Sequence, residues 1–543
     1  MHLRALSLPD PDPWMAALAV GADWLRARLP YGDADLARRA EMDHLDPGRR
    51  RALADALAAQ AAQLGAGEAS RAAIERLRDP RTLVVVAGQQ AGALGGPGYT
   101  LLKAAGAVAY ARRAQALLGR PVVPVFWTAT EDHDVGEIQR LRLPLPGGGH
   151  RDFHLFQPVP AGRRPVGPME AGDALRRLVR EVRESPAMPG AHRQEVLDLA
   201  EGLIDGHPTV GGHFMALMAR LFASTPLVLL DPMDEALRRL VADVFERALL
   251  DPEAVAAAAR AGERAVAAVG REVQVPWQER ETGVFALLDG ERHMLEVEGA
   301  DLVPRGLPGE RAARAAWAER ARRTPAAFSS AVHLRPVVQG ALLPVLGVVL
   351  GPGEVRYHAQ LRELFELFDV PVPVVWPRPR AVLVGGTARR LLTRLGLEVE
   401  DVLGGWQARL EAALAARDTV GIEAAFTRFD ARLAAAHGEL VATVAPLGRD
   451  LVELGEKNLR RMRDEAAWLR SKAEQALRQG NDTLVRQYRT VGEHLAPESG
   501  PQDRHLSFVA FLAQYGLDLG ERLAASDDLC QGGVMAAEVV DAP

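Results

Sequence analysis

The stretch that decides the fold is Thr82-Leu-Val-Val-Val-Ala87, followed directly by Gly88-Gln-Gln-Ala-Gly92-Ala-Leu-Gly95-Gly-Pro-Gly98-Tyr99. The short β-branched run predicts a strand that is buried on both faces of a sheet. The glycine-rich segment predicts a turn, and residues 99–118 predict a helix. A second apolar run, Pro121-Val-Val-Pro-Val-Phe-Trp127, completes a strand–helix–strand unit. Such a unit implies parallel strands joined by a right-handed crossover.

Further apolar runs extend this predicted sheet on both sides of the unit. Helical patterns precede it at 14–78 and recur at 234–270. Strand-like runs occur at 227–231, 342–350 and 371–376. The Pro-, Gly- and Arg-rich residues 144–210 indicate an insertion, and Asp289-Gly290 after an apolar run indicates a hairpin in a second insertion. We therefore predict an α/β core over residues 1–394, with N-terminal helices and insertions at about 144–215 and 270–325.

The pattern changes to a heptad repeat between residues 395 and 490. Apolar residues recur every seven positions, at Phe426, Leu433, Leu440, Leu447 and Leu454. Such spacing is typical of helices that pair in a coiled coil. Pro446 is expected to break the helix, and Gly480-Asn481 to end the next one. We predict a helical coiled-coil arm over 395–500, paired within or between chains. Residues 501–543 are predicted to return to the core and to end in a loose tail from about 525.

Composition limits the class of protein. The chain has 543 residues, a net charge of −6 and 48% hydrophobic residues, which excludes a disordered chain and a bulk positive field for nucleic acid or anionic lipid. The longest apolar stretch, 341–350, is about half of the ~20 residues that span a bilayer. Residues 1–14 lack the features of a signal peptide. One cysteine, Cys530, excludes an intramolecular disulfide and a multi-thiolate zinc site. We expect a cytoplasmic protein with neither a membrane nor a nucleic-acid partner.

The glycine-rich segment is the first of three candidate site clusters. It lies between a strand and a helix, where backbone amides and the helix dipole bind anions. Its spacing matches neither the dinucleotide fingerprint nor the P-loop. The structural alternative is a tight turn that needs glycine. The candidate binding residues are Gly88, Gln89, Gln90, Gly95, Gly96, Pro97 and Tyr99.

The second cluster, Glu131-Asp132-His133-Asp134, follows the strand that ends at Trp127. Open α/β sheets bind ligands at the carboxyl ends of their strands, so Trp127 and these four residues are candidates for a site. Carboxylates beside an imidazole can supply a general base or hold a metal. The residues specify no metal, and a solvated acidic loop is the alternative.

The third cluster combines Arg335 with the segment Gly351-Pro-Gly353-Glu354 and with Tyr357. Arg335 could clamp a carboxylate or a phosphate. The alternative is an ordinary helix N-terminus, with Glu354 favoured in the first turn by the helix dipole.

Together the three clusters resemble one family, the cysteine ligases of bacillithiol biosynthesis, also called the bacillithiol biosynthesis cysteine-adding enzymes. The resemblance rests on the strings quoted above and on Gln502-Asp-Arg504 near Phe511…Tyr515-Gly516. It implies a nucleotidylyltransferase-like Rossmann core with connective insertions and a coiled-coil domain that pairs two subunits into a homodimer. It also implies addition of L-cysteine to the amine of glucosaminyl-malate, the last step in making the low-molecular-weight thiol bacillithiol.

The chain departs from the family pattern at Ala331, Gly340, His358 and Asp503, mostly around the third cluster. The implied fold is similar to that of class I cysteinyl ligases, which activate cysteine with ATP. This chain lacks their paired-histidine and Lys-Met-Ser-Lys-Ser signatures, so ATP use is implied only by analogy and no metal is expected.

The resulting hypothesis is amide-bond formation. His133 or one of its acidic neighbours, Asp132, Glu131 or Asp134, would serve as general base. Gln89, Gln90 and the turn amides would bind substrate or nucleotide, and Arg335 would neutralise malate or phosphate. Two alternatives stay open. One is a metal-dependent hydrolase or transferase acting on a related glycoside conjugate. The other is a non-catalytic, nucleotide-binding dimeric scaffold.

Overall fold

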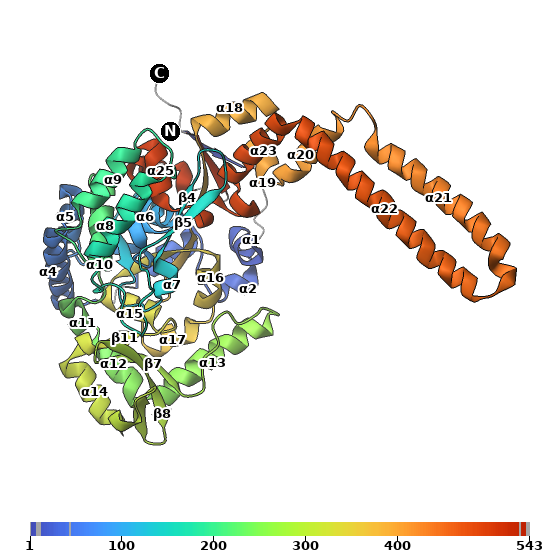
Figure 1. The fold of residues 1–543 in the computed structure, drawn as a ribbon. Helices are drawn as coiled ribbons and strands as arrows, with labels where there is room; N and C mark the ends of the chain where they lie inside the picture. Colours follow the sequence, from blue (N-terminus) through green and yellow to red (C-terminus); the bar gives the residue numbers. More distant parts are fainter. Residues whose placement is uncertain (1, 7–11, 43–44, 531–533, 539–543) are drawn as a thin grey trace. The chain divides into compact units, whose positions relative to one another are not determined.

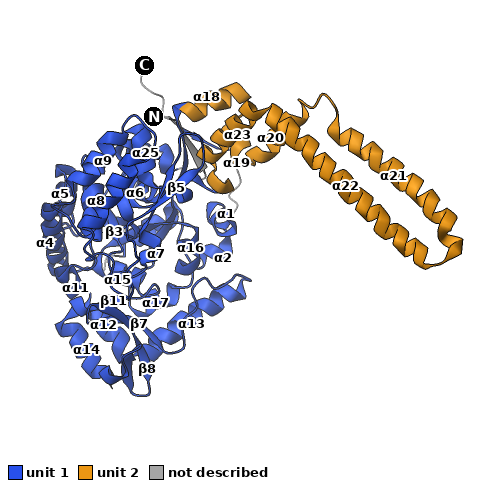
Figure 2. Ribbon diagram, in the orientation of Figure 1, with its two compact units in different colours: residues 1–386, 500–543 blue, residues 387–499 orange. Residues whose placement is uncertain are grey.

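The computed structural model describes residues 2–6, 12–42, 45–530 and 534–538. It divides into two compact units, residues 1–386 with 500–543, and residues 387–499 (Figure 2). Each unit is described by itself below. Among the described residues, no helix is long and apolar enough to cross a membrane. The prediction of no signal peptide concerns residues 1–14, of which 1 and 7–11 lie outside the described residues.

A five-stranded parallel sheet forms the centre of the first unit (Figure 1). Its spatial order is β13-β12-β2-β3-β6. The strands are β2 (Leu83–Gln89), β3 (Val122–Thr128), β6 (Val228–Leu230), β12 (Val345–Leu350) and β13 (Val374–Pro377). From β2 the chain first builds the sheet outward through β3 and then adds β12 on the other side of β2. The strand order therefore reverses between β2 and β12, and such switch points are where open α/β sheets bind ligands. The predicted α/β fold with a parallel sheet is confirmed.

Helices cover both faces of this sheet, which explains why its strands are continuous apolar runs. Val84 and Val86 pack in one layer with α4 (Pro47–Gln63) and α5 (Glu68–Arg76). Leu83, Val85 and Ala87 pack in the other layer, with α6 (Tyr99–Leu118), α10 (Val210–Leu221) and α26 (Leu519–Ala525). Helix α6 has the predicted bounds, and the left-handed Gly119 ends it.

The chain makes two excursions from the sheet. The first contains β4 (Arg140–Pro144), β5 (His150–His154), α8 (Gly172–Glu184) and α9 (Arg193–Gly202). The second is an antiparallel sheet of order β10-β9-β8-β7-β11. Its strands are β7 (Glu281–Leu288), β8 (Glu291–Glu298), β9 (Asp301–Pro304), β10 (Ala312–Ala313) and β11 (Phe328–Ser330). Asp289 and Gly290 both have positive φ and form the predicted hairpin turn.

The remaining helices and strands of the first unit surround this framework. The predicted helical stretch 234–270 is three helices, because Pro252 starts the last of them: α11 (Glu235–Arg239), α12 (Ala242–Leu250) and α13 (Pro252–Ala268). The others are α1 (Pro13–Ala19), α2 (Asp23–Arg26), α3 (Asp33–Ala40), α7 (Val135–Ile138), α14 (Arg314–Arg323), α15 (Arg335–Leu342), α16 (Pro352–His358), α17 (Arg362–Leu367) and β14 (Arg380–Val384).

The C-terminal segment packs against the core. Helices α24 (Gln502–His505) and α25 (Phe508–Tyr515) pack against the glycine-rich turn. The Phe508 amide donates to the Gly96 carbonyl there at 3.0 Å. Strand β15 (Val534–Glu538) pairs with β1 (His2–Ala5) and β14. The prediction of a loose tail from 525 is wrong for this strand, whose backbone bonds are satisfied by two neighbours. Residues 531–533 and 539–543 of that predicted tail lie outside the described residues.

The second unit is entirely helical. It contains most of α18 (Gly386–Leu395), then α19 (Val399–Leu403), α20 (Trp406–Ala415), α21 (Ile422–Val444), α22 (Asp450–Gly480) and α23 (Asp482–Leu495). Helices α21 and α22 form an antiparallel hairpin (Figure 2). Pro446 lies in the turn between them, and α22 ends at Gly480, as the sequence predicts. The hairpin pairs two helices of the same chain.

Candidate functional site

A cavity of about 520 Å³ lies at the switch point of the parallel sheet. The end of β2 and the end of β12 form two of its walls, because both strands stop at this edge. It is lined by members of the first and third predicted clusters and by Trp127: Gly88, Gln89, Gln90, Tyr99, Trp127, Arg335, Gly351, Gly353, Glu354 and Tyr357. The structure thus brings together residues that are up to 269 positions apart in the chain (88 to 357).

A buried lysine ties the two cavity walls together. The Lys103 amine on α6 donates to the Gly88 carbonyl at 2.8 Å and to Gln89 Oε1 at 3.1 Å. It also forms an ion pair with Glu354 at 2.8 Å. Glu354 in turn accepts from the Gly351 amide at 2.7 Å and so caps α16. Burial lowers the pKa of Lys103, against the opposing charge of Glu354. The sequence analysis missed Lys103, although it is the only charged residue between 99 and 111.

The C-terminal segment contributes to the same cavity. Arg378 stacks 4.8 Å from the centre of the Tyr99 ring and pairs with Asp503 at 3.1 Å. Arg504, next to Asp503, lines the cavity. Both Arg378 and Asp503 are buried, so this pair fastens α24 to the cavity wall. Asp503 is one of the departures from the family pattern, and its carboxylate forms this ion pair with Arg378.

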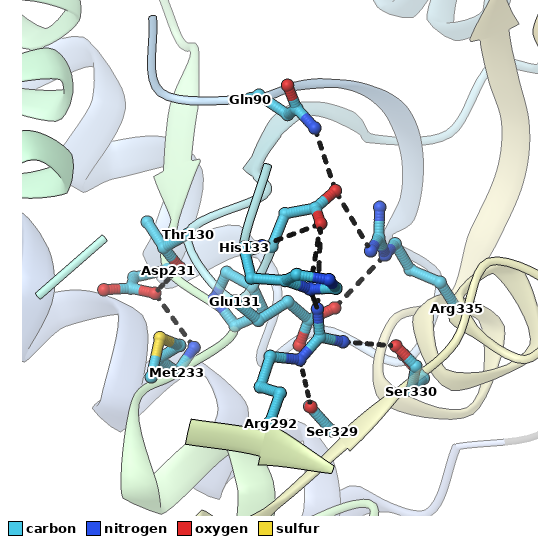
Figure 3. Close-up of polar contacts among 12 residues, drawn as sticks. Gln90, Thr130, Glu131, His133, Asp231, Met233, Arg292, Ser329, Ser330 and Arg335 are labelled. Carbon is cyan, nitrogen blue, oxygen red and sulfur yellow. Dashed lines mark hydrogen bonds and ion pairs between the residues drawn. The ribbon is translucent and has the colours of Figure 1, made fainter. Parts of the chain in front are cut away.

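The second cluster lies beside the cavity and contacts both other clusters (Figure 3). Gln90 Nε2 donates to Asp132 Oδ2 at 2.9 Å, and Arg335 Nη2 lies 3.7 Å from the same oxygen. Glu131 is buried between two arginines. It forms a direct ion pair with Arg238, and its Oε1 lies 3.2 Å from Arg335 Nε. The network therefore joins one residue from the first cluster, two from the second and one from the third.

The carboxyl groups near the cavity have opposite pKa shifts. Burial raises the pKa of Asp132, but the charges of Arg335 and Arg292 and the hydrogen bond from Gln90 outweigh it, so the pKa lies below its usual value. Burial and the nearby charges of Asp132 and Asp134 raise the pKa of Glu137 on α7. Glu137 lines the cavity and was not among the predicted residues. A carboxylate with a raised pKa is better matched to proton transfer than one with a lowered pKa.

His133 is held by an arginine from the inserted sheet. Its Nδ1 lies 3.0 Å from Arg292 Nη1. Arg292 is buried on β8 and donates to Ser329 Oγ at 3.0 Å and to the Ser330 carbonyl at 3.1 Å (Figure 3). Its guanidinium also stacks on the Phe285 ring. Burial and the charge of Arg292 lower the pKa of His133. Arg292 and Arg238 were missed because each is far in sequence from every cluster.

Seven predicted residues lie outside the cavity lining: Gly95, Gly96 and Pro97 of the first cluster, and Glu131, Asp132, His133 and Asp134 of the second, which lies beside the cavity. The glycine turn contacts the C-terminal segment instead, because a Cβ at Gly95 would lie 1.8 Å from the Phe508 ring. The Gly96 carbonyl accepts a hydrogen bond from the Phe508 amide, and Pro97 forms an isolated antiparallel β-bridge with Ser507. Gly95 and Gly96 both have positive φ. These two residues therefore fit the structural alternative to ligand binding, a tight turn that needs glycine. Asp134 caps α7, accepting from the Glu137 amide at 3.2 Å.

The other three departures from the family pattern, Gly340, His358 and Ala331, are all in buried surroundings. A Cβ at Gly340 would lie 2.4 Å from Val370 Cγ1, so this backbone leaves no room for an acidic side chain. His358 is buried against the cavity, and burial lowers its pKa to about 4. It is therefore neutral at physiological pH. Ala331 is buried and donates its amide to the Gly283 carbonyl at 2.8 Å.

The carboxylates of the second cluster are already compensated by guanidinium groups. Among the residues that the structure describes, no three His, Cys, Asp or Glu side chains are grouped so as to hold a metal ion. Arg238, Arg335 and Arg292 surround Glu131 and Asp132. A divalent cation at these oxygens would meet three positive charges, which disfavours the metal-dependent hydrolase among the alternatives.

The fold and the cavity define a class of protein, a Rossmann-like small-molecule-binding protein with a separate coiled-coil domain. Two family models match the chain: the N-terminal Rossmann-like domain of bacillithiol biosynthesis BshC over residues 32–379, and the C-terminal coiled-coil domain of BshC over 381–533. The chain belongs to the BshC family of bacillithiol biosynthesis, which confirms the resemblance seen in its sequence.

Curated relatives match over nearly the whole chain. A protein of Symbiobacterium thermophilum is 34% identical, covering 98% of this chain and 99% of the relative. Proteins of Heliobacterium modesticaldum and Geobacillus thermodenitrificans are 32% and 31% identical, covering 92% and 97% of this chain and 90% and 97% of the relatives. Each carries the name "Putative cysteine ligase BshC".

Proposed function

We propose that this enzyme, a ligase by its family, joins the carboxyl group of L-cysteine to the amine of glucosaminyl-malate and so forms bacillithiol. The observation that carries the proposal is the convergence of Gln90, Asp132 and Arg335 at the edge of one cavity. These residues come from three separate sequence clusters, and each is of a type that binds carboxylates, amines or hydroxyl groups.

The reaction requires activation of the cysteine carboxylate. The amine nitrogen then bonds to the carbonyl carbon, and the bond from that carbon to the activating group breaks. We propose ATP as the source of the activating group, because Arg335, Arg378 and Arg504 line the cavity and suit phosphate or carboxylate oxygens. The negative charges of malate and phosphate would be neutralised by the same side chains.

The amine must lose a proton as it attacks, and Glu137 is the best-placed base. It lines the cavity, and its pKa is raised. Asp132 is engaged by Arg335 and Arg292, which stabilise its charged form and weaken it as a base. Glu131 is buried in ion pairs with Arg238 and Arg335 and does not line the cavity. The proton therefore passes from the amine to the Glu137 carboxylate.

The test is purified protein with glucosaminyl-malate, L-cysteine and ATP, followed by mass spectrometry. The expected product has the mass of both substrates less one water. Omission of cysteine, or its replacement by serine, is the control for a cysteine-dependent product. Absence of that product with every nucleotide tried would overturn the ligase proposal.

We also propose that the protein forms a homodimer through the α21–α22 hairpin and works in the cytoplasm. Large apolar side chains are exposed on the hairpin, among them Leu440, Leu454, Trp468 and Leu469. Exposed apolar surface of this kind marks a contact face, and an identical hairpin offers a matching apolar row.

A further inference from the structure

We propose that His133 acts as a neutral hydrogen-bond donor through Nε2–H, and that Arg292 is the positioning residue that fixes this tautomer. The role assigned to His133 in catalysis rests on the proposed ligase reaction. The tautomer itself rests only on the geometry around the ring.

The hydrogen-bond chemistry of the contact leaves one protonation state. Arg292 Nη1 lies 3.0 Å from His133 Nδ1, and a guanidinium group can only donate. Nδ1 must therefore accept with its lone pair. A neutral imidazole with an accepting Nδ1 carries its proton on Nε2, whereas a protonated ring would place two donors face to face.

Arg292 is well anchored in this position. Its side chain is 2% exposed. Two further donors are occupied by Ser329 and Ser330 on β11, and the guanidinium plane lies 4.1 Å from the centre of the Phe285 ring on β7. A buried guanidinium that is held on three sides is preorganised, so it does not have to move when substrate binds. The inserted sheet thus delivers a fixed donor to the end of β3.

The charges that face His133 come from several elements. Arg292 on β8 is the nearest, and Asp132 Oδ1 lies 3.8 Å from Nδ1. Asp134 and Arg163 act at longer range. Burial together with the two arginines outweighs the two carboxylates, and the pKa of His133 is lowered. The ring is therefore neutral at physiological pH, in agreement with the hydrogen-bond argument.

A neutral imidazole with Nε2–H can stabilise charge that develops on an oxygen. In the proposed reaction, electrons move onto the acyl oxygen as the amine nitrogen bonds to the carbonyl carbon. His133 donates a hydrogen bond there and keeps its proton. The activating group leaves with the electron pair of the broken carbon–oxygen bond, and the amine proton passes to Glu137. His133 is thus a donor in this reaction and not the general base.

Substitutions of His133 distinguish a hydrogen-bond donor from a general base. In His133→Gln, the amide nitrogen can take the place of Nε2–H but cannot accept the amine proton. We expect His133→Gln to keep kcat within about 10-fold of the parent, while His133→Ala loses about 10²–10³-fold, as for the loss of one oxyanion donor. The shorter amide of His133→Asn serves as the matched control and is expected to behave like Ala. Equal losses in Gln and Ala would overturn the donor role.

A readout independent of activity tests the tautomer. Histidine-selective ¹⁵N labelling, with His133→Gln to assign the ring signals, is expected to show a protonated Nε2 and an unprotonated Nδ1 at about pH 8, and a ring pKa below the usual value for His. In Arg292→Leu the ring should titrate at higher pH, and Arg292→Lys should restore part of the parent behaviour. A protonated Nδ1 in the parent would overturn the inference. If neither the parent nor any variant makes product, the ligase proposal fails, and the spectra still decide the tautomer.

Discussion

The cavity edge and the α21–α22 hairpin use the same charged residue types in opposite ways. At the cavity, the side chains of Arg238 and Glu131 are 4% and 2% exposed. On the hairpin, Arg463 and Asp430 pair at 2.7 Å with side chains 47% and 50% exposed. Solvated pairs contribute about 0–1 kcal/mol to stability, whereas burying charges is costly and needs complete pairing. The cavity edge therefore holds buried, paired charge, whereas the hairpin has a solvated charged surface.

Apolar residues show the reverse difference. The strands behind the cavity are buried on both faces, while no side chain of α22, described over all its 31 residues, is buried. Two isolated helices can bury only the seam between them. The hairpin therefore leaves apolar side chains exposed, and the strands behind the cavity do not.

The largest effect is expected from Arg335→Ala. The substitution removes a cation from the cavity wall and leaves Glu131 and Asp132 less compensated. We expect kcat/KM for ligation to fall roughly 10²–10³-fold, the usual loss for one preorganised donor at developing charge. Arg335→Lys keeps the charge and should recover part of the loss. Parent-like rates in Arg335→Ala, measured by product mass spectrometry, would break the assignment of the cavity edge as the site.

Glu137→Gln should have the next largest effect. The base form is the carboxylate, so parent activity is lost as the pH falls through the raised pKa of Glu137. We expect the variant to lose roughly 10²-fold in kcat and to lack this acidic limb, as for removal of a general base. The check is a pH profile of kcat/KM from pH 5 to 9 for the parent and the variant. A variant that retains the acidic limb would contradict the assignment.

Trp468→Glu with Leu469→Glu should change assembly and leave the ligase chemistry intact. Both side chains are more than half exposed in the single chain, so their replacement should not disturb its fold. In a dimer that covers them, two buried carboxylates would weaken association by at least about 100-fold, or roughly 3 kcal/mol. Light scattering measures the mass. The exposed charge reversal Lys457→Glu is the control. A parent that is already monomeric would remove the dimer proposal.

The smallest effect is expected inside the hairpin seam. His437 is buried there, with its Nε2 3.1 Å from Asn458 Oδ1. Asn458→Ala leaves the imidazole without this partner and should cost about 1–2 kcal/mol of unfolding free energy. Chemical denaturation followed by circular dichroism measures it. The exposed substitution Glu456→Ala should cost much less. An equal cost in both variants would show that the polar contact in the seam adds nothing.

Sequence periodicity predicted the elements whose cause is local. The β-branched runs that became β2 and β3, the helix at 99–118 and the breaks at Pro446 and Gly480 all follow from residues near each other. Helices α8 and α9 were not distinguished within the first insertion, because the Pro- and Gly-rich loops around them obscured their periodicity. The strand at 534–538 was missed because its pairing partners, β1 and β14, are distant in the chain.

The sequence by itself determined the α/β class, the helical coiled-coil arm and the family, and it marked Gln90, Asp132 and Arg335 as candidates. Only the tertiary structure decided that these three meet at the switch point, that Gly95 makes room for Phe508, and that Lys103 joins the two walls of the cavity. It also brought Arg292 to His133 across 159 positions. The physical reason is range: periodicity and turn chemistry act between neighbours in the chain, whereas charge pairing and ring contacts depend on distances in space that folding alone sets.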